Sequence, residues 1–121
     1  MKSTNLRRLI AWQWNVYANA HRDRRNLLIH IVGVPLFGAG AVSVLVGLAG
    51  STWTTAAVGA LGMLGGFALQ GLGHRYERDA PPPFASRGEF LARILTEQFV
   101  VFPRFVLSGG WWRNLRAASR S

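Results

Sequence analysis

The hydrophobic pattern of the chain is dominated by one long block without a charged side chain. Residues 26–74 contain no Lys, Arg, Asp or Glu, and the apolar run breaks only at residues 50–52. Each arm is roughly 23 residues long, and a helix of that length spans a ~30 Å hydrocarbon layer at ~1.5 Å per residue. The pattern therefore predicts two transmembrane helices, over residues 27–50 and 53–74, folded back on each other as a hairpin.

The segment before this block, residues 1–25, has the pattern of an amphipathic helix followed by a charged break. Asn5 is a candidate N-cap, and the aromatic residues Trp12 and Tyr17 suit the boundary between water and lipid. Asn26 is the candidate N-cap of the first long helix. We therefore expect an interfacial helix at the N-terminal side of the hairpin.

The segment after the block begins with three prolines, residues 81–83, which form a stiff linker. Ser86 and Glu89 then match a capping box, so a second amphipathic helix is predicted over residues 86–107. The remaining residues, 108–121, form a basic tail. The whole chain is thus expected to be a single all-α membrane domain, residues 1–121.

Charged residues decide whether the segment 86–107 crosses the membrane. Arg93, Glu97 and Arg104 lie within it, and a charge at mid-membrane costs about 2.5–3.5 kcal/mol. We therefore expect this helix to lie in the interface and to bend at Pro103.

The net charge of +9 is concentrated outside the apolar block. Basic residues at both outer ends of the hairpin place both termini in the cytoplasm by the positive-inside rule, and they favour anionic lipid over nucleic acid as the partner. The excess of Arg over Lys favours a bacterial inner membrane. The sequence contains no cysteine, which excludes thiolate chemistry and disulfides.

The three histidines of the chain fall at one end of the predicted hairpin. His30 lies 22 residues before Thr52 and His74 lies 22 residues after it, so both are ~33 Å from the turn. His21 joins them only if the chain turns between it and His30, and the charged break supplies such a turn. Glu77 shares a helix face with His74 at the i, i+3 spacing.

These side chains allow two interpretations. Three imidazoles and one carboxylate suit a metal such as iron, zinc or manganese, and the nearby amides of Asn26 and Gln70 accompany them. The alternative is a structural cluster in which the histidines bond to each other or to the backbone. A metal site predicts that the three rings approach within ~5 Å, because metal–nitrogen bonds are ~2.1 Å long.

The motif His21-x4-Asn26-x3-His30-x2-Gly33-x-Pro35, followed by Gln70-x2-Gly73-His74-x-Tyr76-Glu77-x3-Pro81, adds a family resemblance. Over about residues 17–84 the chain resembles the family of small membrane proteins that includes the 2-hydroxy-fatty-acid α-dioxygenase of phytosphingosine breakdown. Three details depart from that pattern. Arg22 stands where the oxidative members have a second histidine, Glu77 is one residue closer to the last histidine, and Arg24-Arg25 replaces a proline.

The resemblance implies an iron(II)-dependent oxygenase that removes one carbon from a 2-hydroxy fatty acid with the help of O₂. It implies that His21, His30 and His74 hold Fe(II), with Glu77 as a further ligand or as an orienting group. Arg75 or Arg22 would offset the charge of the substrate, whose acyl chain would lie along the glycine-rich hairpin. The rival function is a non-catalytic membrane protein that binds anionic lipid or a partner protein.

Overall fold

The computed structural model describes residues 5–120, and every regular element in that range is helical. Residues 1–4 and 121, which belong to the predicted N-terminal helix and basic tail, lie outside the described range. The elements in chain order are α1 (Leu6–Tyr17), the 3₁₀ turn η1 (Ala18–Ala20), α2 (Arg24–Ala49), α3 (Trp53–His74), α4 (Arg87–Thr96), the π-helical segment η2 (Glu97–Val101), α5 (Phe102–Leu107) and α6 (Gly110–Arg120).

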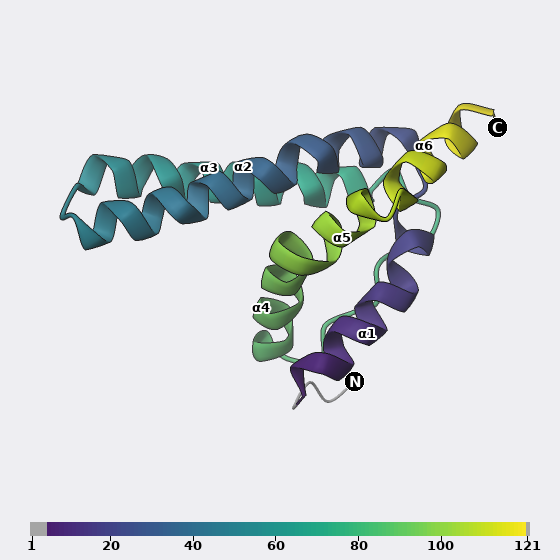
Figure 1. The fold of residues 1–121 in the computed structure, drawn as a ribbon, viewed down its shortest axis with the longest axis horizontal. Coiled ribbons are helices and arrows are strands. Elements are labelled where there is room, and N and C mark those ends of the chain that lie inside the picture. Colours follow the sequence, from purple (N-terminus) through teal and green to yellow (C-terminus); the bar gives the residue numbers. More distant parts are fainter. Residues whose placement is uncertain (1–4, 121) are drawn as a thin grey trace.

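The two longest helices, α2 and α3, run side by side and are joined by the turn at residues 50–52 (Figure 1). Glycines let their backbones approach closely: a Cβ added at Gly40 would lie 2.5 Å from the carbonyl oxygen of Gly59, and one at Gly66 would lie 2.6 Å from that of Gly33. Small residues serve this purpose where two helices pack in lipid.

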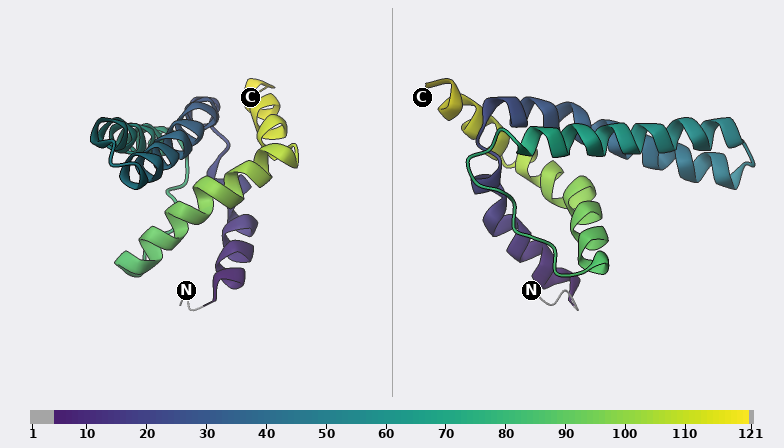
Figure 2. Two further views of the ribbon diagram at one scale, coloured as in Figure 1. Left: turned by 60° about the vertical axis from the view of Figure 1, so that its left-hand side comes forward. Right: turned by 180° about the vertical axis from the view of Figure 1, so that it is seen from behind.

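Both long helices have the length and hydropathy of a membrane crossing. In their most apolar windows the mean hydropathy is 2.2 for α2 and 1.4 for α3, yet only 28% and 22% of those windows are buried inside the protein. The turn end of the pair projects beyond the other helices (Figures 1 and 2) and exposes large apolar side chains such as Leu45 and Leu61. A core helix of a water-soluble protein would instead be mostly buried.

The helix caps test the predicted boundaries. The side chain of Asn5 accepts a hydrogen bond from the amide of Arg7, and Ser86 accepts one from the amide of Glu89, so both predicted caps are confirmed. The prediction that Asn26 caps the first long helix is wrong. That helix begins three residues earlier, with Asp23 as its N-cap, and an acidic cap also interacts favourably with the helix dipole.

The shorter helices gather around the inner end of the α2/α3 pair, which is the end opposite the turn. Helices α1 and α4 extend away from it, and the linker of residues 75–86 runs between them (Figure 2). The region predicted as a basic tail forms helix α6, which packs on α2 and η1: Trp111 donates a hydrogen bond to the carbonyl of Leu27, and Asn114 donates one to the carbonyl of His21. The buried core therefore lies where the histidines meet.

Candidate metal centre

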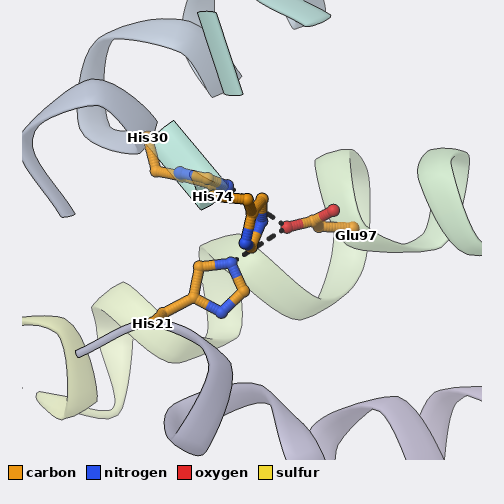
Figure 3. Close-up of side chains that lie close together, drawn as sticks. All are labelled: His21, His30, His74 and Glu97. Atoms are coloured by element: carbon orange, nitrogen blue, oxygen red, sulfur yellow. Dashed lines mark ion pairs between the residues drawn. The ribbon is translucent and has the colours of Figure 1, made fainter. Parts of the chain in front are cut away.

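The fold brings together four side chains from four separate segments at the inner end of the helix pair. They are His21 in the turn before α2, His30 on α2, His74 at the last residue of α3 and Glu97 at the first residue of η2 (Figure 3). The ring centroids of the histidines are 4.7, 4.7 and 4.9 Å apart, which confirms the predicted approach within ~5 Å. One ligand atom from each of the four residues lies within 4.8 Å of the others.

Backbone carbonyls fix the orientation of two imidazoles. Nδ1 of His21 lies 2.8 Å from the carbonyl oxygen of Tyr17, and Nδ1 of His30 lies 3.1 Å from that of Asn26. Because a carbonyl can only accept, each Nδ1 carries the hydrogen, and Nε2 of the neutral ring keeps its lone pair. Both Nε2 atoms are buried and have no hydrogen-bond partner among the described residues.

Glu97 supplies the carboxylate of the group. Its Oε2 lies 3.5 Å from Nε2 of His21 and 3.6 Å from Nε2 of His30, and it accepts a hydrogen bond of 2.7 Å from the hydroxyl of Tyr17. Burial alone would raise the pKa of the Glu97 carboxyl, but close contact with His21 and His30 in their protonated forms outweighs it and holds that pKa well below its ordinary value. The group therefore contains an anionic oxygen.

Tyr17 is a member of the site that the sequence analysis did not identify. Its ring stacks on that of His21 with centroids 3.9 Å apart, and its carbonyl and hydroxyl contact His21 and Glu97 respectively. Burial, followed by the nearby charge of Glu97, raises the pKa of the Tyr17 phenol well above its ordinary value. The phenol therefore stays protonated and donates to Glu97. The four-residue spacing of Tyr17 and His21 was the available sequence signal.

A π-helical turn places Glu97. The amide of Phe102 donates to the carbonyl of Glu97 five residues back, which widens the helix at this point. Pro103 follows directly and has no amide hydrogen for the carbonyl of residue 99, so the regular α-helical pattern is interrupted here. A π-helical segment thus ends just before Pro103, which lies in the first turn of α5, and such π turns occur often at functional sites.

Gln70 does not join the four residues but lies beside them. Its amide forms two reciprocal hydrogen bonds with the amide of Gln98, at 2.9 and 2.7 Å, and both side chains are buried. Gln98 is adjacent to Glu97, and Gln70 lies one helical turn before His74. The pair therefore fixes the position of η2 relative to α3.

The structure does not bring Glu77 to the histidines, and Glu97 contributes the carboxylate instead. Helix α3 ends at His74, so the helical spacing that would place Glu77 beside it does not continue. The Glu77 carboxylate accepts hydrogen bonds from the amides of Arg22 and Asp23 and from the side chain of Asn26, at 2.7–3.2 Å. Glu77 thus holds the turn that carries His21.

A cavity of about 270 Å³ opens onto the group and shares His21, His74 and Glu97 with it. Its lining is mainly apolar and comes from α1, α3, α4 and the proline linker. Arg22 and Arg75, the cations expected near a substrate, are not among its lining residues, whereas Arg93 is. Arg93 donates to the carbonyls of Pro82 and Pro83, so it holds the linker as one wall of the cavity.

The donor set fits a divalent transition metal. Imidazole and carboxylate together suit iron, zinc and manganese, and a metal-binding histidine ordinarily donates its other ring N–H to a carbonyl or carboxylate. His21 and His30 already make that second contact, and their remaining nitrogens are buried without a hydrogen-bond partner in the described part of the chain. A buried polar atom in that state is unfavourable unless a ligand satisfies it.

Comparison with known proteins agrees with the resemblance found in the motif. The model of the Mpo1-like family, described as 2-hydroxy-palmitic acid dioxygenase Mpo1-like, matches residues 8–103. No curated protein and no solved structure matches the chain. Because the family match covers most of the sequence, the chain belongs to the Mpo1-like family.

Proposed function

We propose that this member of the Mpo1-like family is an iron(II)-dependent oxygenase that removes the carboxyl carbon of a 2-hydroxy fatty acid at a membrane surface. The proposal rests on two features that lie next to each other, the His/Glu group and the cavity. A group of three imidazoles and one carboxylate with buried unpaired nitrogens opens directly into a mainly apolar cavity. The family name, which refers to 2-hydroxy-palmitic acid, supplies the substrate class.

His21, His30, His74 and Glu97 would hold the metal. Iron bound there supplies the redox chemistry needed to activate O₂ and a positive charge that attracts the 2-hydroxy carboxylate of the substrate. The protein orients its ligands in advance: the carbonyls of Tyr17 and Asn26 hold two rings in the metal-binding tautomer. The Tyr17 hydroxyl donates to Oε2 of Glu97, the same oxygen that lies nearest His21 and His30, and so fixes the carboxylate.

The overall reaction needs no reductant besides the substrate. With R–CH(OH)–COOH and O₂ as reactants, the products R–COOH, CO₂ and H₂O balance in atoms and electrons. The bond between C1 and C2 breaks, C1 leaves as CO₂, and C2 becomes the carboxyl carbon of the shortened acid. We call His21, His30, His74 and Glu97 together the metal group. The cavity would hold the acyl chain beside this group, and its mainly apolar walls would limit the access of water to the reacting carbon.

The proposed membrane placement rests on α2 and α3. We propose that these helices cross the bilayer as a hairpin, with the metal group at the cytoplasmic face and the shorter helices lying in the interface. Apolar side chains exposed along both helices and basic residues at their inner end support this orientation. A fatty acid could then enter the cavity from the bilayer without passing through water.

The activity is tested with protein purified in detergent, loaded anaerobically with Fe(II) and mixed with O₂ and 2-hydroxyhexadecanoate. We expect one molecule of CO₂ and one of the fifteen-carbon acid per O₂ consumed, and no reaction with hexadecanoate. His74→Ala is the matched inactive control. A structural His/Glu cluster in a lipid-binding protein predicts neither metal binding nor turnover, and that result would overturn the proposal.

A further inference from the structure

Gly71 differs from the tightly packed glycines of α3 in what surrounds it. A Cβ added at Gly59 or Gly66 would lie 2.6 Å from a carbonyl oxygen of α2, so those glycines are needed for helix packing. A Cβ added at Gly71 would meet nothing within 4 Å among the described residues, and Gly71 lines the cavity. Glycine is disfavoured inside a helix. Because helix packing does not require a glycine at position 71, the missing side chain calls for another explanation.

The gap lies between the metal group and an aromatic end of the cavity. On α3, Phe67, Gly71 and His74 follow at i, i+4 and i+7 and therefore share one face. On α4 and η2, Phe90 and Glu97 are likewise seven residues apart. Along either helix the cavity thus extends ~10 Å from the metal group to a phenylalanine.

Aromatic rings line that end of the cavity. The rings of Phe67 and Phe90 are 5.8 Å apart between centroids, and those of Phe84 and Phe90 are 4.9 Å apart. Trp12 from α1 also lines the cavity. Most polar groups on the walls bond to protein: Gln70 pairs with Gln98, and Arg93 pairs with Glu89 and with two proline carbonyls. Outside the metal group, Gln13 Oε1 and Arg93 Nε are the buried polar wall atoms without a hydrogen-bond partner among the described residues. The passage therefore presents mostly apolar surface to an occupant.

We propose that Gly71 is a specificity-determining residue whose missing side chain lets a long acyl chain run from the metal group to the Phe67–Phe84–Phe90 end of the cavity. This inference rests on the proposed function and names the path of its substrate. The acyl chain thus lies between α1, α3 and α4. It does not lie along the glycine-rich α2/α3 pair toward the turn. An unbranched alkyl chain fits this path because the cavity is mainly apolar and joins the metal group at one end.

The test is Gly71→Leu, which fills the passage without a clash against the backbone. Gly65→Leu is the matched control, because Gly65 lies on the same helix, does not line the cavity, and its added Cβ would touch only a Leu36 methyl at 4.0 Å. Ile94→Trp narrows the same passage from α4 and serves as a second variant should Gly71→Leu fail to fold.

The first readout does not depend on catalysis. A sixteen-carbon fatty acid with a diazirine near the middle of its chain, ~10 Å from the carboxyl group to match the length of the passage, is bound to the detergent-purified protein, photolysed and mapped by mass spectrometry. We expect adducts at Trp12, Phe84 or Phe90 in the wild-type protein and in Gly65→Leu, and at least a tenfold loss of these adducts in Gly71→Leu and Ile94→Trp. Labelling confined to the lipid-facing sides of α2 and α3, or unchanged in both blocking variants, overturns the inference.

The second readout separates this inference from the proposed reaction. Each buried methylene is worth about fourfold in affinity, so kcat/KM in the wild-type enzyme should rise with chain length from 2-hydroxybutyrate to 2-hydroxyhexadecanoate. Gly71→Leu should lower kcat/KM for the long acid at least tenfold and leave that for the short acid within about twofold. Correct labelling without any turnover supports the acyl site and refutes the oxygenase, whereas turnover with unaltered chain-length preference in both blocking variants refutes the role of Gly71.

Discussion

The two ends of the α2/α3 pair are built on different principles. Toward the turn, contact is made by backbone against backbone: a Cβ at Gly40 would lie 2.5 Å from the carbonyl oxygen of Gly59, and Gly47 packs on the amide of Ala56. At the inner end the same helices bury polar side chains, among them Asn26, His30 and Gln70. The outer end stabilises the pair through close packing, and the inner end gives up apolar packing to position donor atoms.

The two ends therefore differ in how much they depend on a bound metal. Glycine packing is complete within the protein itself, because its contacts need no further partner. The inner end instead contains buried ring nitrogens without a hydrogen-bond partner in the described part of the chain, and such groups are unfavourable until something binds them. We therefore expect changes at the inner end to alter metal binding and activity, and changes at the outer end to alter stability alone.

The largest effect is expected from His30→Ala at the inner end. Removing a metal ligand should lower iron affinity and turnover by more than the ~10–100-fold typical of residues that only orient a ligand. Iron titration and O₂ consumption measure this change. Val42→Ala, on the exposed surface of the same helix, is the control and should change neither quantity.

The second prediction concerns the glycine packing between α2 and α3 toward the turn. In Gly40→Ala the new methyl group meets the α3 backbone, and such overpacking costs about 1–3 kcal/mol. In Gly62→Ala the nearest atom is 3.5 Å away, so this control should be neutral or stabilising by up to ~1 kcal/mol. Denaturant unfolding in mild detergent measures both. Equal destabilisation by the two variants would show that close glycine packing is not what holds the helices together.

The turn that carries His21 at the inner end is tested with Glu77→Gln. This change weakens the charge-assisted hydrogen bonds to the amides of Arg22 and Asp23 and should destabilise the protein by about 2 kcal/mol. Iron should still bind, with affinity lowered by roughly tenfold because His21 is less well positioned. The control Asp79→Asn, at an exposed acid nearby, should change stability by less than ~0.5 kcal/mol. If Glu77→Gln abolished iron binding, Glu77 would be a ligand after all.

The smallest net effect is expected from the amide pair at the inner end. Gln70→Leu alone leaves the buried Gln98 amide without its partner, which costs about 1–3 kcal/mol. The double variant Gln70→Leu, Gln98→Leu removes both amides and should be less destabilised than the single one. Unfolding measurements on the single and double variants give the coupling between the two residues, and a purely additive result would rule out the pairing.

The sequence predicted most of the architecture, because its strongest signals are local. The uncharged block, the break at residues 50–52 and the capping motif at Ser86 each specify a helix or its start from nearby residues alone. The convergence of His30 and His74 was also predictable, since their equal distances from the turn at residues 50–52 imply equal depth, and the charged break before α2 allowed His21 to join them. The family resemblance was confirmed by the match over residues 8–103.

The identity of the carboxylate could not be obtained in that way. Glu77 was selected because a helical spacing joins it to His74, but α3 ends at His74 and the spacing loses its meaning there. Glu97 was considered only as a charge that keeps its segment out of the membrane. Its place beside the histidines depends on a π-helical turn and on the Gln70–Gln98 pair, and neither long-range packing nor helix widening is visible in a local pattern.

The most direct test of the central claim is an anaerobic Fe(II) titration of the purified protein, with the bound iron counted per chain. We predict one iron for the wild-type protein, a weakened site in Glu97→Gln and none in the variant that replaces His21, His30 and His74 by alanine. Circular dichroism of the triple variant should still show its helices. If the wild-type protein binds no iron, or the triple variant still binds one per chain, the four residues are not a metal centre.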